Sequence, residues 1–159
     1  MDEILELLQE NSRLTPKQIA TMLDMDESEV ADKISEIEKE RVIVKYGATV
    51  NWDNSSCDVV SALIEVKVQP QRGVGFNEVA RRIYNFPEVR SMYLMSGNFD
   101  FLLEIKCSNL REIADFVSYK LSTIEFVQST ATNFVLQTYK QDGVVFEPEE
   151  IKERLKVTP

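Results

Sequence analysis

The fold of this chain is decided by residues 15–50, which read TPKQIATMLDMDESEVADKISEIEKERVIVKYGATV. The segment Thr15-Pro16-Lys17-Gln18 is typical of a helix start, because it combines a capping threonine, a proline at the first helical position and a capping-box glutamine. A second start follows at Asp26, and apolar residues then recur at helical spacing from Val30 to Ile37. Only a tight corner fits between the two helices. The pattern therefore predicts a helix-turn-helix, the motif whose second helix enters the major groove of DNA.

Two shorter patterns extend this unit. Apolar residues line one face of an expected helix at residues 2–11, and residues 42–50 are β-rich on either side of a Lys45-Tyr46-Gly47 turn. The second pattern predicts a two-stranded wing. We therefore expect a winged helix-turn-helix domain over residues 1–53, followed by a polar linker at residues 54–57.

The second half of the chain alternates between strand and helix periodicity. The patterns follow in the order strand, helix, strand, strand, helix, strand, at residues 59–68, 76–84, 89–95, 101–106, 109–121 and 127–139. This order is the ferredoxin-like βαββαβ layout, an α+β fold in which two helices cover one face of an antiparallel sheet. We expect that domain at residues 58–141, with a C-terminal extension at residues 142–159 whose charged helix begins at Pro148.

A sheet of this kind leaves its second face uncovered, which predicts self-association. We also expect more apolar strand residues than two helices can cover, and hence at least a homodimer. These residues are Val60, Ala62, Ile64, Val66 and Val68 in one strand and Phe101, Leu103 and Ile105 in another.

Composition excludes several classes of protein. The 159-residue chain has no histidine, the commonest general base and metal ligand, and Cys57 and Cys107 lack metal-ligand spacing. We therefore expect no enzyme, no metal and no cofactor. No apolar run approaches the roughly 20 residues that cross a bilayer. No signal peptide precedes the first helical pattern, so a cytoplasmic protein is expected.

Charge is the feature that argues against nucleic-acid binding. The net charge is −9, and residues 1–53 hold 13 acidic and 6 basic side chains. The half that contains the helix-turn-helix is thus the more acidic one. A protein-interaction module with weak or no DNA binding therefore stands beside a DNA-binding domain as an alternative for this half.

The order of elements resembles the leucine-responsive and asparagine-regulator (Lrp/AsnC) family of prokaryotic transcription regulators. The most specific likeness is in residues 93–103, YLMSGNFDFLL, which resemble the family's effector loop between two strands. Residues 129–139, STATNFVLQTY, resemble its last strand, and the Val30-x-x-Lys-Ile-x-x-Ile37 spacing resembles its recognition helix. The likeness covers residues 1–141.

The resemblance implies dimers formed through the C-terminal sheets, with further assembly into tetramers, octamers or rings. It also implies double-stranded DNA with dyad symmetry as a partner. Glu36 stands where the family commonly has arginine. We expect DNA contacts from Lys17, Ser28, Lys33, Arg41 and Lys45, with Arg13 as a further cation for phosphates. In the alternative, an interaction module acts through hetero-oligomers with a more basic paralogue.

The resemblance further implies an amino-acid effector bound where C-terminal units meet. Asp100 then binds the ammonium group of the amino acid, while exposed N–H groups at residues 96–98 bind its carboxylate. A plain hairpin turn is the alternative, since Gly97-Asn98 is ordinary turn chemistry. The expected effector contacts are Ser96, Gly97, Asn98, Phe99 and Asp100 in the loop, with Gln128, Thr130 and Thr132 in the last strand.

Three further features have plainer interpretations. Trp52 is expected to pack at a domain junction, Arg81-Arg82 to lie on a solvated helix face, and the glutamates after residue 146 to face solvent. A branch of proteins with this architecture decarboxylates tetrapyrroles through histidines, which this chain lacks.

Overall fold

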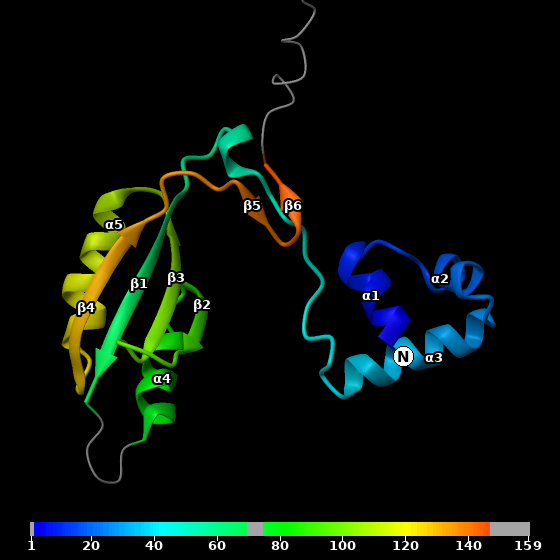
Figure 1. Ribbon diagram of the computed structural model, residues 1–159, viewed down its shortest axis with the longest axis horizontal. Coiled ribbons are helices and arrows are strands. Elements are labelled where there is room, and N and C mark those ends of the chain that lie inside the picture. The colour runs from blue at the N-terminus through cyan, green and yellow to red at the C-terminus, as the bar shows by residue number, and fades with distance from the viewer. Residues whose placement is uncertain (1, 70–74, 147–159) are drawn as a thin grey trace, which may run out of the picture. The chain divides into compact units, whose positions relative to one another are not determined.

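The computed structural model describes residues 2–69 and 75–146. The chain forms two compact units that divide between Val50 and Asn51 (Figure 1), and the expected linker lies within the second unit. No helix in the described ranges is long and apolar enough to cross a membrane.

Three helices form the first unit: α1 (Asp2–Glu10), α2 (Pro16–Leu23) and α3 (Glu27–Lys39). α2 begins at the predicted capping box, in which the Thr15 hydroxyl accepts from the Gln18 N–H at 3.3 Å and the Gln18 side chain accepts from the Thr15 N–H at 2.9 Å. Asp26 caps α3, since its Oδ1 atom accepts from the Ser28 N–H at 2.8 Å. These bonds satisfy N–H groups that a helix start leaves without partners, and both predicted starts are confirmed.

The corner between α2 and α3 depends on the backbone of Asp24. This residue takes the left-handed conformation with φ 52°, which lets the Met25 N–H donate to the Ala20 carbonyl at 3.0 Å and ends α2 abruptly. The turned helices then enclose one apolar core, made of Ile4, Leu8, Ile19, Ala20 and Val30. The predicted helix-turn-helix is therefore confirmed.

The predicted strand pair of the wing is not formed, and that expectation was wrong. Residues 42–50 contain no strand in the described structure. The N–H groups of Val42 and Ile43 donate to the Ile37 carbonyl at the end of α3, at 3.0 and 3.4 Å, so they are not available to a ladder. Val44 and most other apolar side chains of the segment are exposed, and a lone hairpin that buries nothing is marginally stable in water.

The second unit is built on a four-stranded antiparallel sheet in the order β2-β3-β1-β4. Two helices, α4 (Phe76–Tyr84) and α5 (Leu110–Asp115), lie on one face of it (Figure 1). The strands are β1 (Val60–Val68), β2 (Val89–Leu94), β3 (Phe101–Cys107) and β4 (Val127–Phe134). A π-helical turn at Phe116–Lys120 and a 3-10 turn at Leu121–Thr123 continue α5. The ferredoxin-like fold is confirmed.

The apolar faces of β1 and β3 lie under the two helices. Antiparallel register pairs Ala62 with Ile105, Ile64 with Leu103 and Val66 with Phe101, and all six are at most 2% exposed. Their cover comes from the helical residues Val79, Ile83, Ile113, Phe116 and Leu121. The expectation that two helices leave these strand residues uncovered was therefore wrong, because alternation puts them on the single face that the helices occupy.

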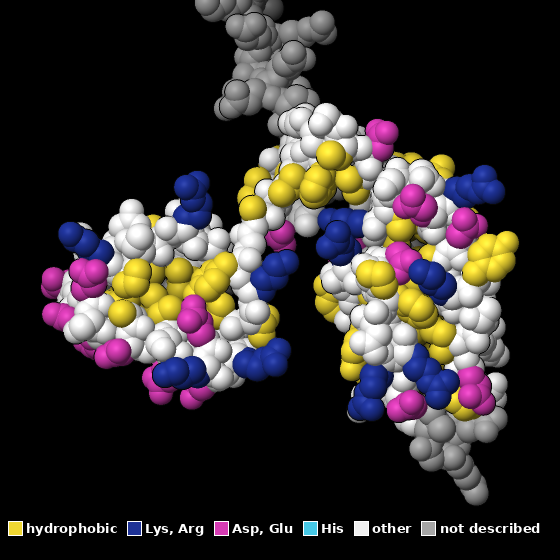
Figure 2. All heavy atoms as spheres, turned by 180° about the vertical axis from the view of Figure 1, so that it is seen from behind, with side chains coloured by type: hydrophobic (Ala, Val, Ile, Leu, Met, Phe, Trp, Pro, Cys, Tyr) yellow, Lys and Arg dark blue, Asp and Glu magenta, His cyan; other side chains and the backbone are white. Residues whose placement is uncertain are grey.

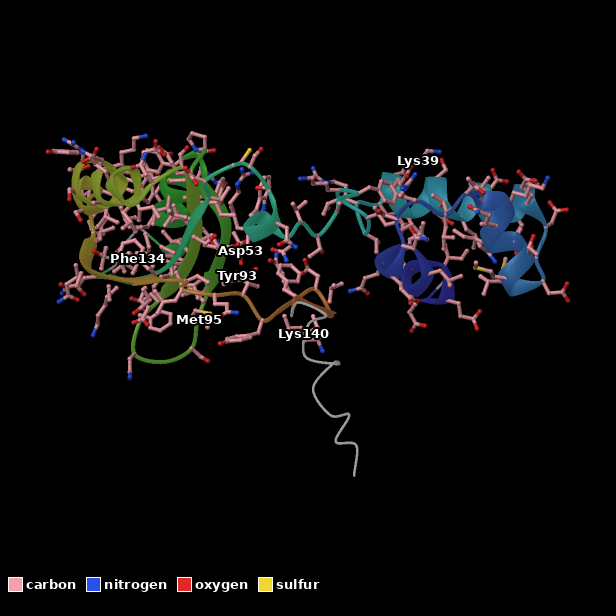
Figure 3. All side chains as sticks on the ribbon, turned by 90° about the horizontal axis from the view of Figure 1, so that it is seen from above. Lys39, Asp53, Tyr93, Met95, Phe134 and Lys140 are labelled. Atoms are coloured by element: carbon pink, nitrogen blue, oxygen red, sulfur yellow. The ribbon has the colours of Figure 1, made fainter. Side chains whose placement is uncertain are left out.

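The opposite face of the sheet is the one left open in this chain, and it mixes polar and apolar side chains. One row across it contains Tyr93, Leu102, Glu65 and Ala131, and the next contains Ser91, Glu104, Leu63 and Asn133. Leu63 is 38% exposed and Tyr93 is 55% exposed. Tyr93 of this face and Met95 just after β2, both labelled in Figure 3, are exposed.

The last strand is shorter than predicted. β4 ends at Phe134 rather than Tyr139, because its ladder with β1 stops at the pair of Ala62 and Phe134. A small hairpin follows, made of β5 (Lys140–Gln141) and β6 (Val144–Val145). Its Asp142-Gly143 turn has positive φ at both residues, 48° and 83°, as a type I′ turn requires. The helix predicted from Pro148 lies outside the described residues.

Candidate functional sites

The exposed surface of α3 is acidic. Seven of its thirteen residues are ionisable, and the exposed carboxylates are those of Glu27, Glu29, Asp32, Glu36 and Glu38. In Figure 2, acidic side chains gather along the left edge of the N-terminal unit. Such a surface accepts hydrogen bonds from cytosine amino groups but cannot neutralise phosphates.

Ser28 and Lys33, the two predicted DNA contacts on α3, already have partners within the helix. The Ser28 hydroxyl donates to Asp26 Oδ1 at 2.6 Å, and this bond lowers the pKa of the Asp26 carboxyl. Lys33 Nζ lies 2.7 Å from Glu29 Oε1, one helical turn away. Contact of either side chain with DNA therefore competes with an existing bond.

Three other expected cations lie outside α3 and form no ion pair within the described part of the chain. Lys17 lies in the first turn of α2, Lys45 lies in the segment after α3, and Arg13 precedes α2. All three are exposed, and none forms an ion pair with another described residue. They are the part of this unit best able to contact phosphates without a prior rearrangement.

Arg41 has a backbone role as well as a charge. It takes the left-handed conformation with φ 59°, its N–H donates to the Glu38 carbonyl at 3.1 Å, and the next N–H donates to the Ile37 carbonyl. This pair of bonds is a Schellman motif, which usually places glycine at the left-handed position. The segment that follows is held by the Tyr46 hydroxyl, which donates to Glu38 Oε1 at 2.8 Å.

The predicted effector loop is the turn between β2 and β3. Ser96, Gly97 and Asn98 are exposed, and Gly97 has φ 144°, a conformation that other residues rarely adopt. The Met95 N–H donates to the Asp100 carbonyl at 2.8 Å and closes the turn. The structure thus presents three successive residues of the loop to solvent while its base is fixed.

Asp100 has a structural partner inside the chain. Its Oδ2 atom accepts from the Val68 N–H at 2.8 Å, and its own N–H donates to the Val66 carbonyl at 3.0 Å. The carboxylate therefore caps the end of β1, as the hairpin interpretation implies. Oδ1 has no such bond within the described structure and remains an acceptor for a ligand.

The three expected contacts from the last strand lie at different distances from this loop. Gln128 is the extra residue of a β-bulge opposite Lys67 and Val68, close to the point where Asp100 caps β1. Thr130 and Thr132 pair with Val66 and Ile64, so they are half-buried on the helix-covered face of the edge strand. The structure brings Gln128 and Asp100 to one end of the sheet and places Thr132 farther along it.

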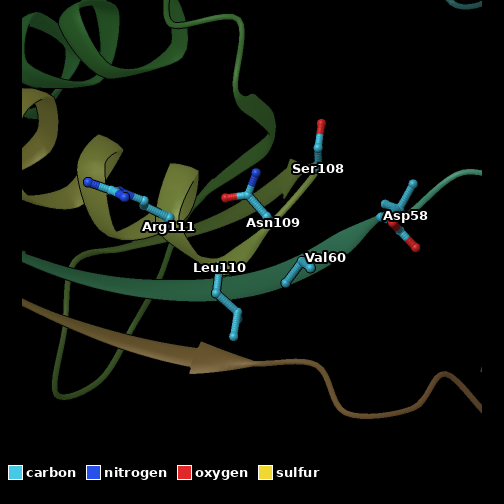
Figure 4. A pocket seen from close by; sticks show the side chains of 7 residues that line it. Asp58, Val60, Ser108, Asn109, Leu110 and Arg111 are labelled. Atoms are coloured by element: carbon cyan, nitrogen blue, oxygen red, sulfur yellow. The ribbon is translucent and has the colours of Figure 1, made fainter.

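Two neighbouring hollows lie at the opposite end of the sheet, where Val60 pairs with Cys107. Figure 4 shows the first, between Asp58 before β1 and Leu110 at the start of α5. The lining of the second, the Trp52 hollow, includes Trp52, Asp58, Pro87, Glu88, Arg90 and Cys107. Sequence analysis missed both; the one available signal was a lone tryptophan beside a polar linker.

Glu88 and Cys107 differ in their ionisation within the Trp52 hollow. Burial alone would raise the pKa of Glu88, but a hydrogen bond from Lys120 holds it below its usual range. Burial raises the pKa of the Cys107 thiol, and the nearby Glu112 and Glu88 raise it further. Glu88 is therefore charged at neutral pH, while Cys107 is a neutral thiol and a poor nucleophile.

Comparison with known proteins decides the family. A model of the Lrp/AsnC ligand-binding domain matches residues 61–145, and a model of a winged helix-turn-helix DNA-binding domain matches residues 3–44. The chain belongs to the Lrp/AsnC family. It is accordingly a DNA-binding transcription regulator with a small-molecule-binding domain, and the resemblance seen in the sequence is confirmed.

This Lrp/AsnC regulator is similar to the HTH-type transcriptional regulator YugG of Bacillus subtilis, with 48% identity over 99% of this chain and 95% of that protein. Its fold is similar to that of the regulator NMB0573 of Neisseria meningitidis, solved as an L-Met complex, with 24% identity, a TM-score of 0.72 and coverage of 87% and 89%. AsnC of E. coli shares the fold with 19% identity, a TM-score of 0.69 and coverage of 87% and 91%.

Proposed function

We propose that this regulator changes its binding to DNA when a free amino acid occupies the β2–β3 turn of the second unit. The observation that carries the proposal is the form of this turn. Exposed N–H groups at residues 96–98 suit the ligand's carboxylate, and Asp100 Oδ1 suits its ammonium group. The neighbouring Gln128 adds a polar side chain from the bulge in β4.

A homodimer is part of the proposal. The open face of the sheet carries exposed Leu63 and Tyr93 among polar side chains such as Ser91 and Glu104. A second copy placed on that face buries these residues and pairs two helix-turn-helix units for a dyad operator. Higher assembly into tetramers or octamers follows from the same family resemblance.

DNA contact is proposed for Lys17, Lys45 and Arg41, with Lys33 joining after it leaves Glu29. Oligomers compensate for weak half-sites, because linked units bind with a high effective concentration. The affinity for DNA is expected to fall only gradually with salt concentration, since few phosphates are neutralised per subunit.

The test combines mobility shift and thermal shift. Binding to the DNA upstream of the regulator's own gene is measured with and without each natural amino acid at millimolar concentration, and melting of the protein is followed in parallel. We expect one or a few amino acids to raise the melting temperature and to change DNA binding. If no amino acid does either, the effector assignment is wrong.

The acidity of α3 favours one alternative, an interaction module with weak or no DNA binding that acts through a more basic paralogue. Glu36→Arg separates the two functions, because it places a cation on an exposed position of α3. Retardation of DNA by the wild type, strengthened by the variant, supports DNA binding. Absence of retardation at low salt for both proteins supports the interaction module.

A further inference from the structure

The Trp52 hollow holds two opposite charges that have no partner. Asp58 and Arg90 both line it, and neither side chain forms a hydrogen bond or an ion pair with any other residue that the structure describes. We propose that this hollow is a second ligand site, which binds a free α-amino acid through Arg90 at its carboxylate and Asp58 at its ammonium group. The site goes beyond the effector loop and does not depend on it.

The position of Arg90 supports a binding role. Val89 pairs with Ile105 and Ser91 with Glu104, so Arg90 is the extra residue of a β-bulge in the edge strand β2. A bulge turns a side chain out of the regular alternation of a strand, and bulges are common beside binding sites. A guanidinium group binds a carboxylate through two parallel hydrogen bonds, which suits the acidic end of the ligand.

Glu88 adds a second negative charge to the lining on the ammonium side. It is ionised, its Oε1 atom accepts from Lys120, and its Oε2 atom is buried without a hydrogen-bond partner in the described structure. Asp58 is exposed and has no partner in the described structure, so it accepts the hydrogen bonds of the ammonium group, while the charge of Glu88 favours a cationic group over a neutral one.

The wall of the hollow suits an apolar side chain. Trp52 is 41% exposed and Pro87 lies beside the same space, so an aliphatic or aromatic group finds apolar surface there. Small zwitterions with an apolar side chain match all of these features, and anions or simple cations match only one.

This site and the effector loop lie at opposite ends of β1. Val60 pairs with Cys107 beside the hollow, while Val66 pairs with Phe101 beside the loop. Six residues of strand separate the two pairs, which corresponds to about 20 Å. A ligand at one end therefore makes no contact at the other, and each site can be tested alone.

Trp52 provides the readout, because it is the only tryptophan in the chain. Its fluorescence is measured in the full-length protein during titration with each natural L-amino acid other than tryptophan, and equilibrium dialysis measures binding directly. We expect at least one amino acid to give a saturable change, and its N-acetyl amide, which lacks both charges, to give none. Comparison of the amino acid with its N-acetyl amide tests whether binding requires the ligand's two charges, without any change to the protein.

Variants then locate the site. Arg90→Gln and Asp58→Asn should each weaken the response about tenfold or more, because each removes one charge-assisted contact. The matched controls Arg81→Gln and Asp115→Asn, and the loop variant Asn98→Ala, should leave it unchanged. Circular dichroism checks that every variant is folded.

Two outcomes overturn the site. One is a response that Arg90→Gln and Asp58→Asn leave intact or that the N-acetyl amide reproduces, and the other is the absence of both a fluorescence change and binding in dialysis. In the first case, loss of binding in Asn98→Ala would assign the response to the proposed effector loop.

Discussion

Asp100 closes the end of β1 by accepting a hydrogen bond from the Val68 N–H at its Oδ2 atom, 2.8 Å away. The bond ties the base of the β2–β3 turn to the central strand of the sheet. The exposed loop residues 96–98 are consequently presented from a fixed base. The Asp100 carboxylate thus stabilises the fold, and any role in ligand binding must be compatible with this hydrogen bond.

Removal of this carboxylate should cost stability. We expect Asp100→Ala to lower the free energy of unfolding by about 1–3 kcal/mol, because a half-buried N–H loses its acceptor. Asp100→Asn should cost less, since its amide oxygen still accepts. Urea denaturation measures both, and Asp115→Ala, an exposed carboxylate on α5, is the control. Equal stability of Asp100→Ala and the control would show that the Val68 bond contributes nothing.

The pair of Lys33 and Glu29 sets the charge available to DNA. Glu29→Gln should release the Lys33 ammonium group and raise affinity for non-specific DNA up to about fivefold, the range of a surface ion pair. Lys33→Ala should lower it. Fluorescence anisotropy with a labelled duplex at low salt measures the change. Glu6→Gln on α1 makes the same change in net charge, and an equal gain from that control would assign the effect to overall charge alone.

Arg41 allows the backbone and the charge to be separated. Arg41→Gly should raise the free energy of unfolding by about 0.5–1 kcal/mol, because glycine adopts a positive φ without the Cβ penalty. The same variant should weaken DNA binding, since a cation is lost. Arg41→Lys keeps the charge and the strain, and should alter neither property much. If Arg41→Gly instead destabilises the protein, the side chain makes contacts that outweigh the strain.

The elements that sequence alone predicted are those in which local chemistry and tertiary packing agree. The capping box at Thr15 and the N-cap at Asp26 predicted α2 and α3 of the first unit, and strand alternation predicted the sheet of the second. The wing failed because Val42 and Ile43 donate to the end of α3, a competition that periodicity does not show. The end of β4 was overestimated because the ladder with β1 stops at the pair of Ala62 and Phe134, whereas the β-rich sequence continues to Tyr139.

The site residues were harder to predict because their partners are distant in sequence. The loop at Gly97 is visible as a motif, but the capping of Val68 by Asp100 spans 32 residues and depends on strand register. The same holds for the Trp52 hollow, which joins residues from three separate segments. Neither the hydrogen bond nor the hollow is therefore visible as a local pattern in the sequence.

Acid should destabilise the protein in a defined direction. The pKa values of Asp26 and Glu88 are lowered in the folded state, so their stabilising contribution is complete above the ordinary carboxyl pKa and is lost as the pH falls through the lowered folded values. We expect the melting temperature to fall below about pH 4 and to stay nearly constant between about pH 6 and 8, since no histidine titrates there. Melting by circular dichroism across pH measures this, and Glu88→Gln should reduce the acid-dependent part. A large step near pH 6.5 in the wild type would contradict the assignment.

The open sheet face should determine the oligomeric state. Leu63 lies between Glu104 and Asn133 in one row of that face, and burial of such a surface against a second copy needs at least about 1,000 Å² in total. We expect light scattering at micromolar concentration to give at least twice the 18.3 kDa of the monomer. Leu63→Asp should shift the protein toward the monomer, because it adds a charge beside Glu104 within the buried face.

Tyr119→Asp, on the exposed π-helical turn away from the sheet, is the matched control and should leave the mass unchanged. A wild-type mass of one monomer throughout the micromolar range would show that this face stays open in solution.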